Sequence, residues 1–145
     1  MTASPEVCAI CVDDAALAVG HGWSISIPSG RAPILGWVTL HPVAHRSSPE
    51  QLSSAEAEAL GSYLRATATY LVARTGAERI YVANWAEACR HVHFHLISRL
   101  PELADQFQGA RIFDLMGGAQ DRPAIAAQFE LLTALRQHLT KEGIA

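Results

Sequence analysis

The chain has 145 residues, of which 50% are hydrophobic, and this length and composition are typical of one compact domain with a sizeable core. Its formal net charge is −3, and Lys and Arg neither cluster nor alternate with aromatic residues, so nucleic acid is not an expected partner. The N-terminus lacks the features of a secretory signal, and no apolar run approaches the roughly 18 residues of a membrane span. We therefore expect a cytoplasmic protein with no membrane segment and a single domain over residues 1–145.

Two cysteines near the N-terminus have metal-ligand spacing. Cys8 and Cys11 form a Cys-x2-Cys pair, whose sulfurs can reach one zinc ion but fill only half of its tetrahedron. The alternative is two small buried thiols, which are common in protein cores. A disulfide framework is not expected, because cytosolic thiols stay reduced. Cys89 is predicted to be a buried or loop thiol.

Two strands are predicted next along the chain. Residues 22–27 alternate large apolar with small polar side chains, and Pro28 begins a turn that ends this strand. Residues 34–41 form a second apolar-rich run, which Pro42 ends because proline cannot donate a backbone hydrogen bond.

A helix is predicted from Ser53 to about Arg74. Ser53 and Glu56 have the spacing of a capping box, and Gly76 offers a helix stop. Apolar residues recur at helical spacing and are expected to lie on the sheet: Leu60, Leu64, Ala68, Leu71 and Val72. A further strand is predicted over residues 79–84, which contain Ile80, Tyr81 and Val82, residue types common in strands.

Residues 90–98 contain three histidines at alternate positions, His91, His93 and His95. Apolar residues stand between and after them, namely Val92, Phe94 and Leu96. Period two predicts a strand with all three imidazoles on one face. Because a strand rises roughly 3.3 Å per residue, the outer pair would be about 13 Å apart, close to the limit at which two imidazoles could reach one ion. Three such histidines make a poor single tetrahedral site, although an adjacent pair could share a metal ion with ligands from elsewhere. We therefore expect the three histidines to have different tasks.

The chain ends in a predicted helix that begins near Pro123, a residue tolerated in a first helical turn. Its apolar stripe comprises Ile125, Phe129, Leu132, Leu135 and Leu139. This stripe could cover the sheet or a second subunit. The order strand, strand, helix, strand, strand, helix predicts an α+β domain with an antiparallel sheet.

Residues 91–97 resemble the signature of the histidine-triad (HIT) family, His-φ-His-φ-His-φ-φ with φ apolar, at every position. The resemblance extends over about residues 8–100, and residues 101–145 are interpreted as a C-terminal helical extension. It implies an antiparallel sheet of about five strands packed with helices, and a homodimer. It also implies a nucleotide hydrolase or nucleotidyl transferase in which His93 attacks the α-phosphate of a nucleoside phosphoramidate or dinucleoside polyphosphate, forming a nucleotidyl-histidine. His95 would orient the phosphate oxygens.

The same resemblance implies a structural zinc ion. Some HIT proteins bind zinc through an N-terminal Cys-x2-Cys pair, a histidine in a Pro-x-x-His segment and the first histidine of the triad. Residues 42–45 match that segment in this sequence. The implied ligands are Cys8, Cys11, His45 and His91.

The sequence departs from the family pattern at two places. Trp37 follows Gly36 where the family has an additional histidine, and it could fill the core or stack on a nucleobase. His41 could supply an imidazole instead, or could be an ordinary surface or core histidine. The usual Gly-Gln segment before the triad is also absent. Asn84 matches an asparagine that often contacts substrate, so we predict that it binds substrate, although it could simply form a turn.

Two alternatives to a hydrolase remain open. One is a nucleotide-binding module with little or no turnover, which the Trp37 substitution favours. The other is a metalloenzyme in which His93 and His95 bind a catalytic metal ion.

Overall fold

The computed structural model describes residues 8–141, which form a five-stranded sheet with the strand order β1-β2-β3-β5-β4. All neighbouring strands are antiparallel. The strands are β1 (Leu17–Gly20), β2 (Trp23–Ser26), β3 (Trp37–Pro42), β4 (Arg79–Ala83) and β5 (Phe94–Arg99). The predicted α+β class and antiparallel sheet are confirmed. The fifth strand, β1, has only four residues and no clear alternation of apolar and polar residues, so the sequence pattern did not predict it. Only the family resemblance implied a fifth strand.

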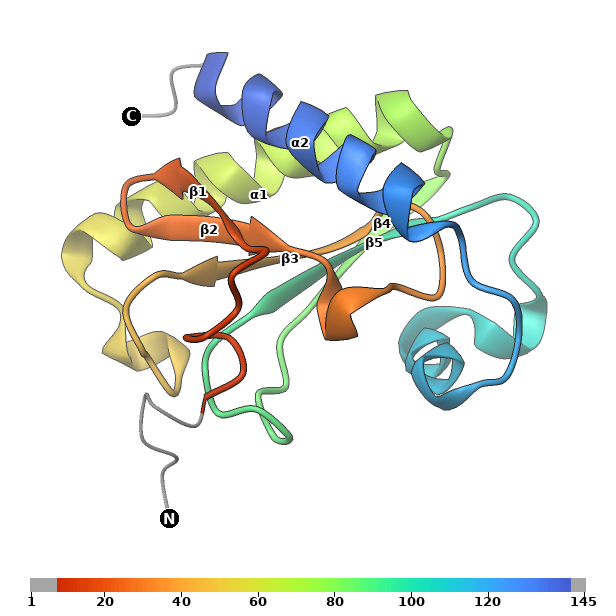
Figure 1. Ribbon diagram of the computed structural model, residues 1–145, viewed down its shortest axis with the longest axis horizontal. Helices are drawn as coiled ribbons and strands as arrows, with labels where there is room; N and C mark the ends of the chain where they lie inside the picture. The colour runs from red at the N-terminus through yellow and green to blue at the C-terminus, as the bar shows by residue number, and fades with distance from the viewer. Residues whose placement is uncertain (1–7, 142–145) are drawn as a thin grey trace.

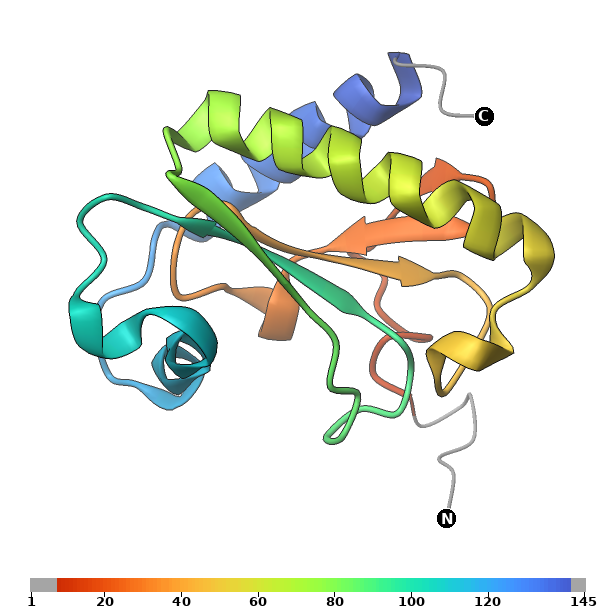
Figure 2. The ribbon, with the colours of Figure 1, turned by 180° about the vertical axis from the view of Figure 1, so that it is seen from behind.

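Both long helices, α1 (Ser54–Thr75) and α2 (Ile125–Lys141), lie on the same face of the sheet (Figure 1). In the view from behind, Figure 2 shows α1 in front of α2 along that face, while the β4–β5 connection lies on the other side of the sheet. Short 3-10 turns occupy residues Pro28–Gly30, Pro49–Gln51, Asp105–Phe107 and Gly109–Gly117. None of the helices described between residues 8 and 141 is long and apolar enough to cross a membrane. The face of the sheet opposite α1 and α2 is therefore the one left for a site.

The apolar stripe of α2 packs within its own chain. Leu132, Leu135 and Leu139 are fully or almost fully buried, as predicted, whereas Ile125 at the first turn is 38% exposed. These leucines belong to one core cluster with Ile25 of β2. Burying the stripe against the sheet removes its apolar surface from water, so this face does not need a second subunit to cover it.

The predicted ends of α1 are confirmed. The Ser53 hydroxyl accepts from the Glu56 backbone N–H (3.1 Å), and the Glu56 carboxylate accepts from the Ser53 N–H (2.7 Å), which completes the capping box. Gly76 ends the helix with φ 73°. The buried face differs from the predicted stripe, because Tyr63 is buried and Val72 is 44% exposed.

Tyr63 explains the rotation of that face. Its hydroxyl donates to the carbonyl oxygens of Val19 and Gly20, both at 2.9 Å. Because a buried hydroxyl needs such a partner, these contacts turn Tyr63 toward β1. The predicted stripe was based on apolar residues alone, so it did not include Tyr63, whose hydroxyl is held by hydrogen bonds.

Two strands begin later than the sequence pattern predicted. Gly36 has φ 89°, a left-handed conformation that interrupts an extended strand, so β3 starts at Trp37 rather than at residue 34. Strand β5 starts at Phe94, because its pairing with β3 ends at the Leu40–Phe94 pair. His91 and His93 therefore precede the strand, and this part of the strand prediction was wrong.

Substituting Gly36 with alanine is expected to lower the free energy of unfolding by about 1–3 kcal/mol, because the φ of Gly36 is positive. An added Cβ would also stand 2.5 Å from the Ser98 hydroxyl and 2.8 Å from Thr75 Cγ2. Urea denaturation measures the change. Gly61→Ala is the matched control, because Gly61 lies exposed in α1 with no atom within 4 Å of its added Cβ. That control should stabilise by up to about 1 kcal/mol. Equal stability of Gly36→Ala and wild type would contradict the prediction.

Candidate active site and metal centre

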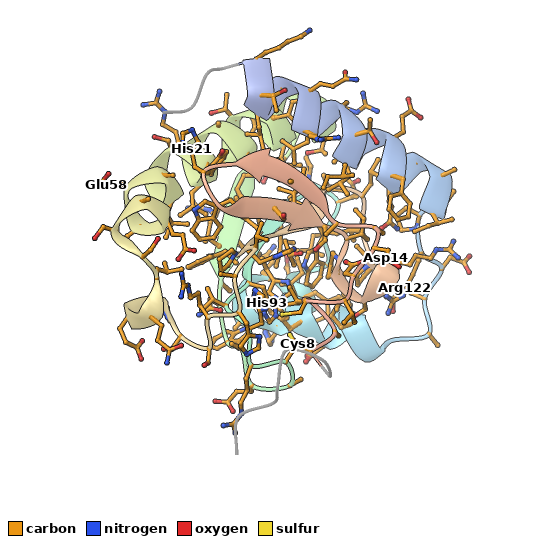
Figure 3. The ribbon with its side chains drawn as sticks, turned by 60° about the vertical axis from the view of Figure 1, so that its left-hand side comes forward. Cys8, Asp14, His21, Glu58, His93 and Arg122 are labelled. Carbon is orange, nitrogen blue, oxygen red and sulfur yellow. The ribbon has the colours of Figure 1, made fainter. Side chains whose placement is uncertain are left out.

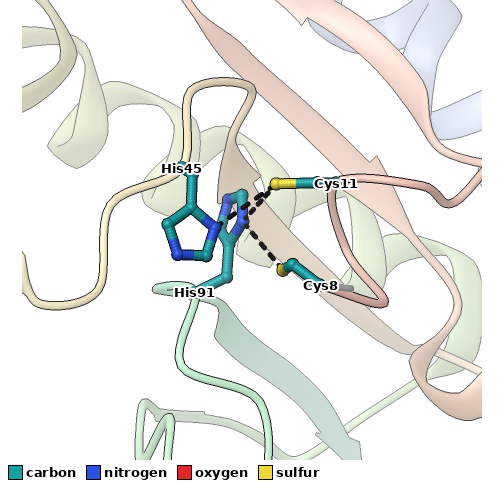
Figure 4. A group of neighbouring side chains, drawn as sticks. All are labelled: Cys8, Cys11, His45 and His91. Atoms are coloured by element: carbon teal, nitrogen blue, oxygen red, sulfur yellow. Dashed lines mark hydrogen bonds between the residues drawn. The ribbon is translucent and has the colours of Figure 1, made fainter. Parts of the chain in front are cut away.

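The four predicted metal ligands lie together (Figure 4). The ligating atoms of Cys8, Cys11, His45 and His91 are all within 4.8 Å of one another. Nδ1 of His91 is 3.5 Å from Cys8 Sγ and 3.4 Å from Cys11 Sγ, and Nδ1 of His45 is 3.3 Å from Cys11 Sγ. A tetrahedron with ligand bonds of about 2.0–2.3 Å has edges of about 3.3–3.8 Å, so these separations suit one zinc ion.

The surroundings of His91 prepare it to bind a metal ion. His91 is fully buried, and its Nε2 is 2.8 Å from the backbone carbonyl oxygen of Pro42. A carbonyl oxygen only accepts, so Nε2 carries the proton and Nδ1 presents its lone pair to the two sulfurs. Burial also lowers the pKa of His91, which favours the neutral form that ligates. The donor set, two thiols and two imidazoles, is compatible with zinc.

Three segments far apart in the sequence contribute these ligands. Cys8 and Cys11 stand in the N-terminal turn, where the Val12 N–H donates to the Cys8 carbonyl at 3.2 Å. His45 follows β3, and His91 comes just before β5. The cluster therefore joins the N-terminal segment to the middle of the sheet.

A third sulfur lies next to this cluster. Cys89 Sγ is 3.8 Å from Cys8 Sγ, and Cys89 is half-buried in the connection between β4 and β5. The prediction that Cys89 is a buried or loop thiol agrees with this position. All three described cysteines are free thiols.

A pocket of about 620 Å³ opens on the sheet face opposite α1, and Phe129 of α2 also lines it. His93 and His95 line it, together with Ser26 and Thr39 from the central strands. Figure 3 shows His93 on this side of the sheet, with Cys8 beyond it. Metal cluster and pocket are therefore neighbours, and the histidine triad divides between them: His91 belongs to the cluster, and the other two belong to the pocket.

The backbone determines the protonation of His93. Nδ1 of His93 is 2.6 Å from the carbonyl oxygen of His91. Because that oxygen can only accept, Nδ1 is a protonated nitrogen, and in the neutral ring the lone pair lies on Nε2. A half-buried imidazole in this tautomer presents a nucleophilic nitrogen at Nε2.

Trp37 donates a hydrogen bond to the ring of His95. The indole Nε1–H of Trp37 donates to Nδ1 of His95 at 2.9 Å, and the two residues are 1% and 6% exposed. An indole only donates, so Nδ1 of His95 is unprotonated and the proton lies on Nε2. Burial, and secondly the neighbouring His93, lower the pKa of His95 from 6.5 to about 4. Of the two readings of Trp37, the structure supports the core position, and the indole also contacts the site.

Two other candidates lie outside the pocket lining. The Asn84 side-chain oxygen accepts from the backbone N–H of His93 at 3.3 Å, so Asn84 holds the segment that carries His93. Its contact with substrate stays a prediction. His41 is 3% exposed, and its ring packs edge-on against His91 at 5.7 Å. His41 is thus a core histidine behind the metal cluster, and burial lowers its pKa to about 4.

One wall of the pocket was not predicted from the sequence. Phe113 and Met116, from the 3-10 turn Gly109–Gly117, line it together with Trp85. The Phe113 ring lies 5.0 Å from His95 and 5.3 Å from Trp37, edge-on to both. The only signal was an apolar run outside any regular pattern, over residues 112–116.

Acidification is expected to destabilise the protein through His95. Between pH 6.5 and about pH 4 the unfolded state binds a proton at this residue and the folded state does not. The free energy of unfolding therefore falls as the pH is lowered through this window, by up to about 1.4 kcal/mol per pH unit. His95→Gln keeps an acceptor for Trp37 but does not titrate. The free energy of unfolding of this variant should therefore change less with pH, by up to about 1.4 kcal/mol per pH unit in this window. Urea denaturation at several pH values compares the two proteins. Parallel slopes would contradict the expectation.

No protein-family model matches the chain, and no curated protein matches it in sequence. Among solved structures, it is similar to a hypothetical histidine triad nucleotide-binding protein from Sulfolobus tokodaii strain7, with a TM-score of 0.64, 12% identity, and 92% of this chain and 93% of that chain covered. It is also similar to a Zn-bound histidine triad family protein from Mycobacterium smegmatis, with a TM-score of 0.61, 16% identity, and coverages of 97% and 98%. A third similar structure is a Hit-like protein involved in cell-cycle regulation from Bartonella henselae. Its TM-score is 0.61 at 13% identity, with 85% of this chain and 86% of that chain covered. At these identities the similarity establishes a shared fold.

Proposed function

We propose that this chain, which has the histidine-triad fold, is a nucleotide hydrolase that cleaves at the α-phosphate through a nucleotidyl-His93 intermediate. Its substrates are nucleoside phosphoramidates or dinucleoside polyphosphates. A phosphate acceptor in place of water would make the same chemistry a nucleotidyl transfer. The homodimer and the cytoplasmic location inferred from the sequence are part of this proposal.

One observation carries the proposal: the two pocket histidines are held in opposite tautomers. His93 has its proton on Nδ1 and a lone pair on Nε2, and His95 has its proton on Nε2. Their rings are 5.0 Å apart. One pocket thus presents a nucleophile beside a hydrogen-bond donor, which is the pairing that attack on a phosphate requires.

In the first step, His93 Nε2 bonds to the α-phosphorus. The bond from phosphorus to the leaving group breaks, and the leaving group departs with the electron pair and takes a proton from solvent. His95 Nε2–H donates to a phosphate oxygen and offsets the charge that develops there. In the second step, water attacks the phosphorus, the phosphorus–nitrogen bond breaks, the electron pair returns to Nε2 and the water proton passes to solvent.

Zinc at Cys8, Cys11, His45 and His91 would have a structural role in this scheme. Four protein ligands leave no open position for water or substrate. Ala9 and Ile10, which lie between the two cysteines, line the pocket. The cluster would therefore hold one wall of the pocket in place.

The test is release of nucleotide from adenosine phosphoramidate and from a dinucleoside polyphosphate by the purified protein. A rapid acid-free quench should also reveal a chain heavier by one nucleotidyl group, with the group mapped to His93. Single-turnover samples should be taken before the adduct has time to hydrolyse. Nucleotide release with no adduct in those samples would contradict the covalent mechanism.

A nucleotide-binding module with little turnover is the second candidate. One observation favours it: of the residues that line the pocket in the described part of the chain, none is Lys or Arg, whereas Asp13 and Glu87 are acidic. A pocket without fixed cations gives the phosphate charge less support than enzymes of phosphoryl transfer usually provide. Nucleotide bound in equilibrium dialysis, with no release of product, would establish this alternative.

The third reading, a catalytic metal at His93 and His95, gains no support from the described residues. The cluster with metal-ligand geometry between residues 8 and 141 contains neither histidine. The Nδ1 atoms of both already have hydrogen-bond partners, His91 and Trp37. Zinc content above one ion per chain, lost in His93→Ala, would favour it.

A further inference from the structure

We propose that Trp37 is a positioning residue, which holds His95 in the neutral Nε2–H tautomer through its indole hydrogen bond. The inference rests on the proposed function, because it concerns how the donor of that reaction is kept ready. In this arrangement an indole, which does not titrate, fixes by a hydrogen bond which nitrogen of a catalytic imidazole carries the proton.

The geometry first excludes the other tautomer. If Nδ1 of His95 carried the proton, two N–H groups would face each other across 2.9 Å. Both side chains are buried, so water cannot relieve that conflict and one donor would be left unsatisfied. An imidazolium has the same N–H at Nδ1, so it is excluded for the same reason.

The strands place the two residues so that this contact is made without adjustment. His95 of β5 is the direct partner of Thr39 on β3, and Trp37 is the partner of Ile97. Trp37 and Thr39 are two apart on β3 and therefore point to the same face of the sheet as His95. The indole thus reaches His95 diagonally across neighbouring strands.

The environment strengthens the effect. The indole ring is also edge-on to the imidazole, with centroids 5.9 Å apart, and Phe113 packs against both rings. An apolar enclosure of this kind raises the cost of a charged ring or of an unpaired donor. Only Nε2 of His95 is then available to a ligand in the pocket, and it is a donor.

The chain offers a matched control for this residue. Trp23 is also fully buried and also donates its indole N–H to an acceptor, the Glu56 carbonyl oxygen at 3.0 Å. That acceptor lies in the turn of α1 on the helix-covered face. Trp37→Phe and Trp23→Phe therefore remove the same atoms and the same type of hydrogen bond, but only the first removes a contact with His95.

The experiment is a long-range nitrogen–proton NMR spectrum of the histidine rings at pH 7 in wild type and both variants. We expect His95 of wild type to be more than about nine-tenths Nε2–H, and the Nδ1–H form to become measurable in Trp37→Phe. Trp23→Phe should leave the tautomer of His95 unchanged. A wild-type His95 with a protonated Nδ1, or a tautomer ratio that Trp37→Phe does not move, would overturn the inference.

Kinetics separate this inference from the proposed function. For a substrate that turns over, Trp37→Phe should lower kcat by about tenfold with little change in KM, because the donor acts mainly in the transition state. Trp23→Phe should change kcat no more than its loss of stability explains. Absence of turnover in wild type, with the expected tautomer, would refute the hydrolase and leave the positioning role of Trp37 intact. Normal kcat in Trp37→Phe, with turnover in wild type, would refute the positioning role alone.

Discussion

Replacing His93 with alanine is expected to lower nucleotide release by at least about 10⁴-fold, because the variant has no atom that can form the nucleotidyl intermediate. The substitution leaves the backbone N–H that donates to Asn84 in place. Since the wild-type side chain is only half-buried, the variant should also fold. The measurement is release of nucleotide in the steady state and in single turnovers.

His21→Asn is the control for this loss. His21 is an exposed turn residue with φ 54°, a conformation that asparagine tolerates, and it does not line the pocket. Its variant should retain wild-type release within about twofold. Because both variants remove one imidazole, a difference between them isolates the role of the pocket histidine. Substantial release by His93→Ala would show that another nucleophile, or water itself, attacks the phosphorus.

Removal of zinc from the cluster of Cys8, Cys11, His45 and His91 is expected to lower the free energy of unfolding by more than Gly36→Ala does. A ligand that binds only the folded state contributes about 4 kcal/mol when its free concentration is 1,000 times its Kd. For a chain of this length, that contribution corresponds to roughly 10 °C or more in Tm. A chelator should therefore lower Tm by this amount, and added zinc should restore it. Calorimetry with and without the chelator measures the shift.

Cysteine variants test which sulfurs hold the metal ion. Cys8→Ser and Cys11→Ser should each reduce the zinc content from about one ion per chain to well below half, because each removes one of four ligands. Cys89→Ser is the matched control, since Cys89 lies 3.8 Å from Cys8 but outside the group of four. This variant should keep its zinc. Zinc lost only in Cys89→Ser would show that the ion is bound by a different set of residues.

The fold was largely predictable, because each long element carries a local signal. The capping box at Ser53 and the stop at Gly76 mark both ends of α1, and backbone geometry at these positions depends mainly on neighbouring residues. Strand limits were less predictable. The start of β5 at Phe94 depends on where β3 stops pairing with it, which is a property of two segments far apart in the sequence.

The candidate site shows the same division. The alternation of histidines over residues 91–95, with the resemblance that it supports, predicted a nucleophile, His93, and a set of four metal ligands. The structure brings those four ligands together. The separation of His91 from His93 and His95 agrees with the expectation that the three histidines have different tasks, although His91 and His93 precede the strand on which they were predicted. By contrast, Phe113 came from a segment without regular pattern, so no sequence signal placed it against His95.

The sequence by itself determined which residues are candidates for a metal centre or an active site and which elements they flank, because residue type and spacing are local properties. Only the tertiary structure decided the protonation of those residues. The His91 carbonyl directs the proton of His93, the Pro42 carbonyl directs that of His91, and the Trp37 indole directs that of His95. Whether a ring nitrogen carries a proton or a lone pair depends on whether the atom that faces it is an acceptor or a donor. For His91 and His95 that atom comes from β3, a strand distant in the sequence.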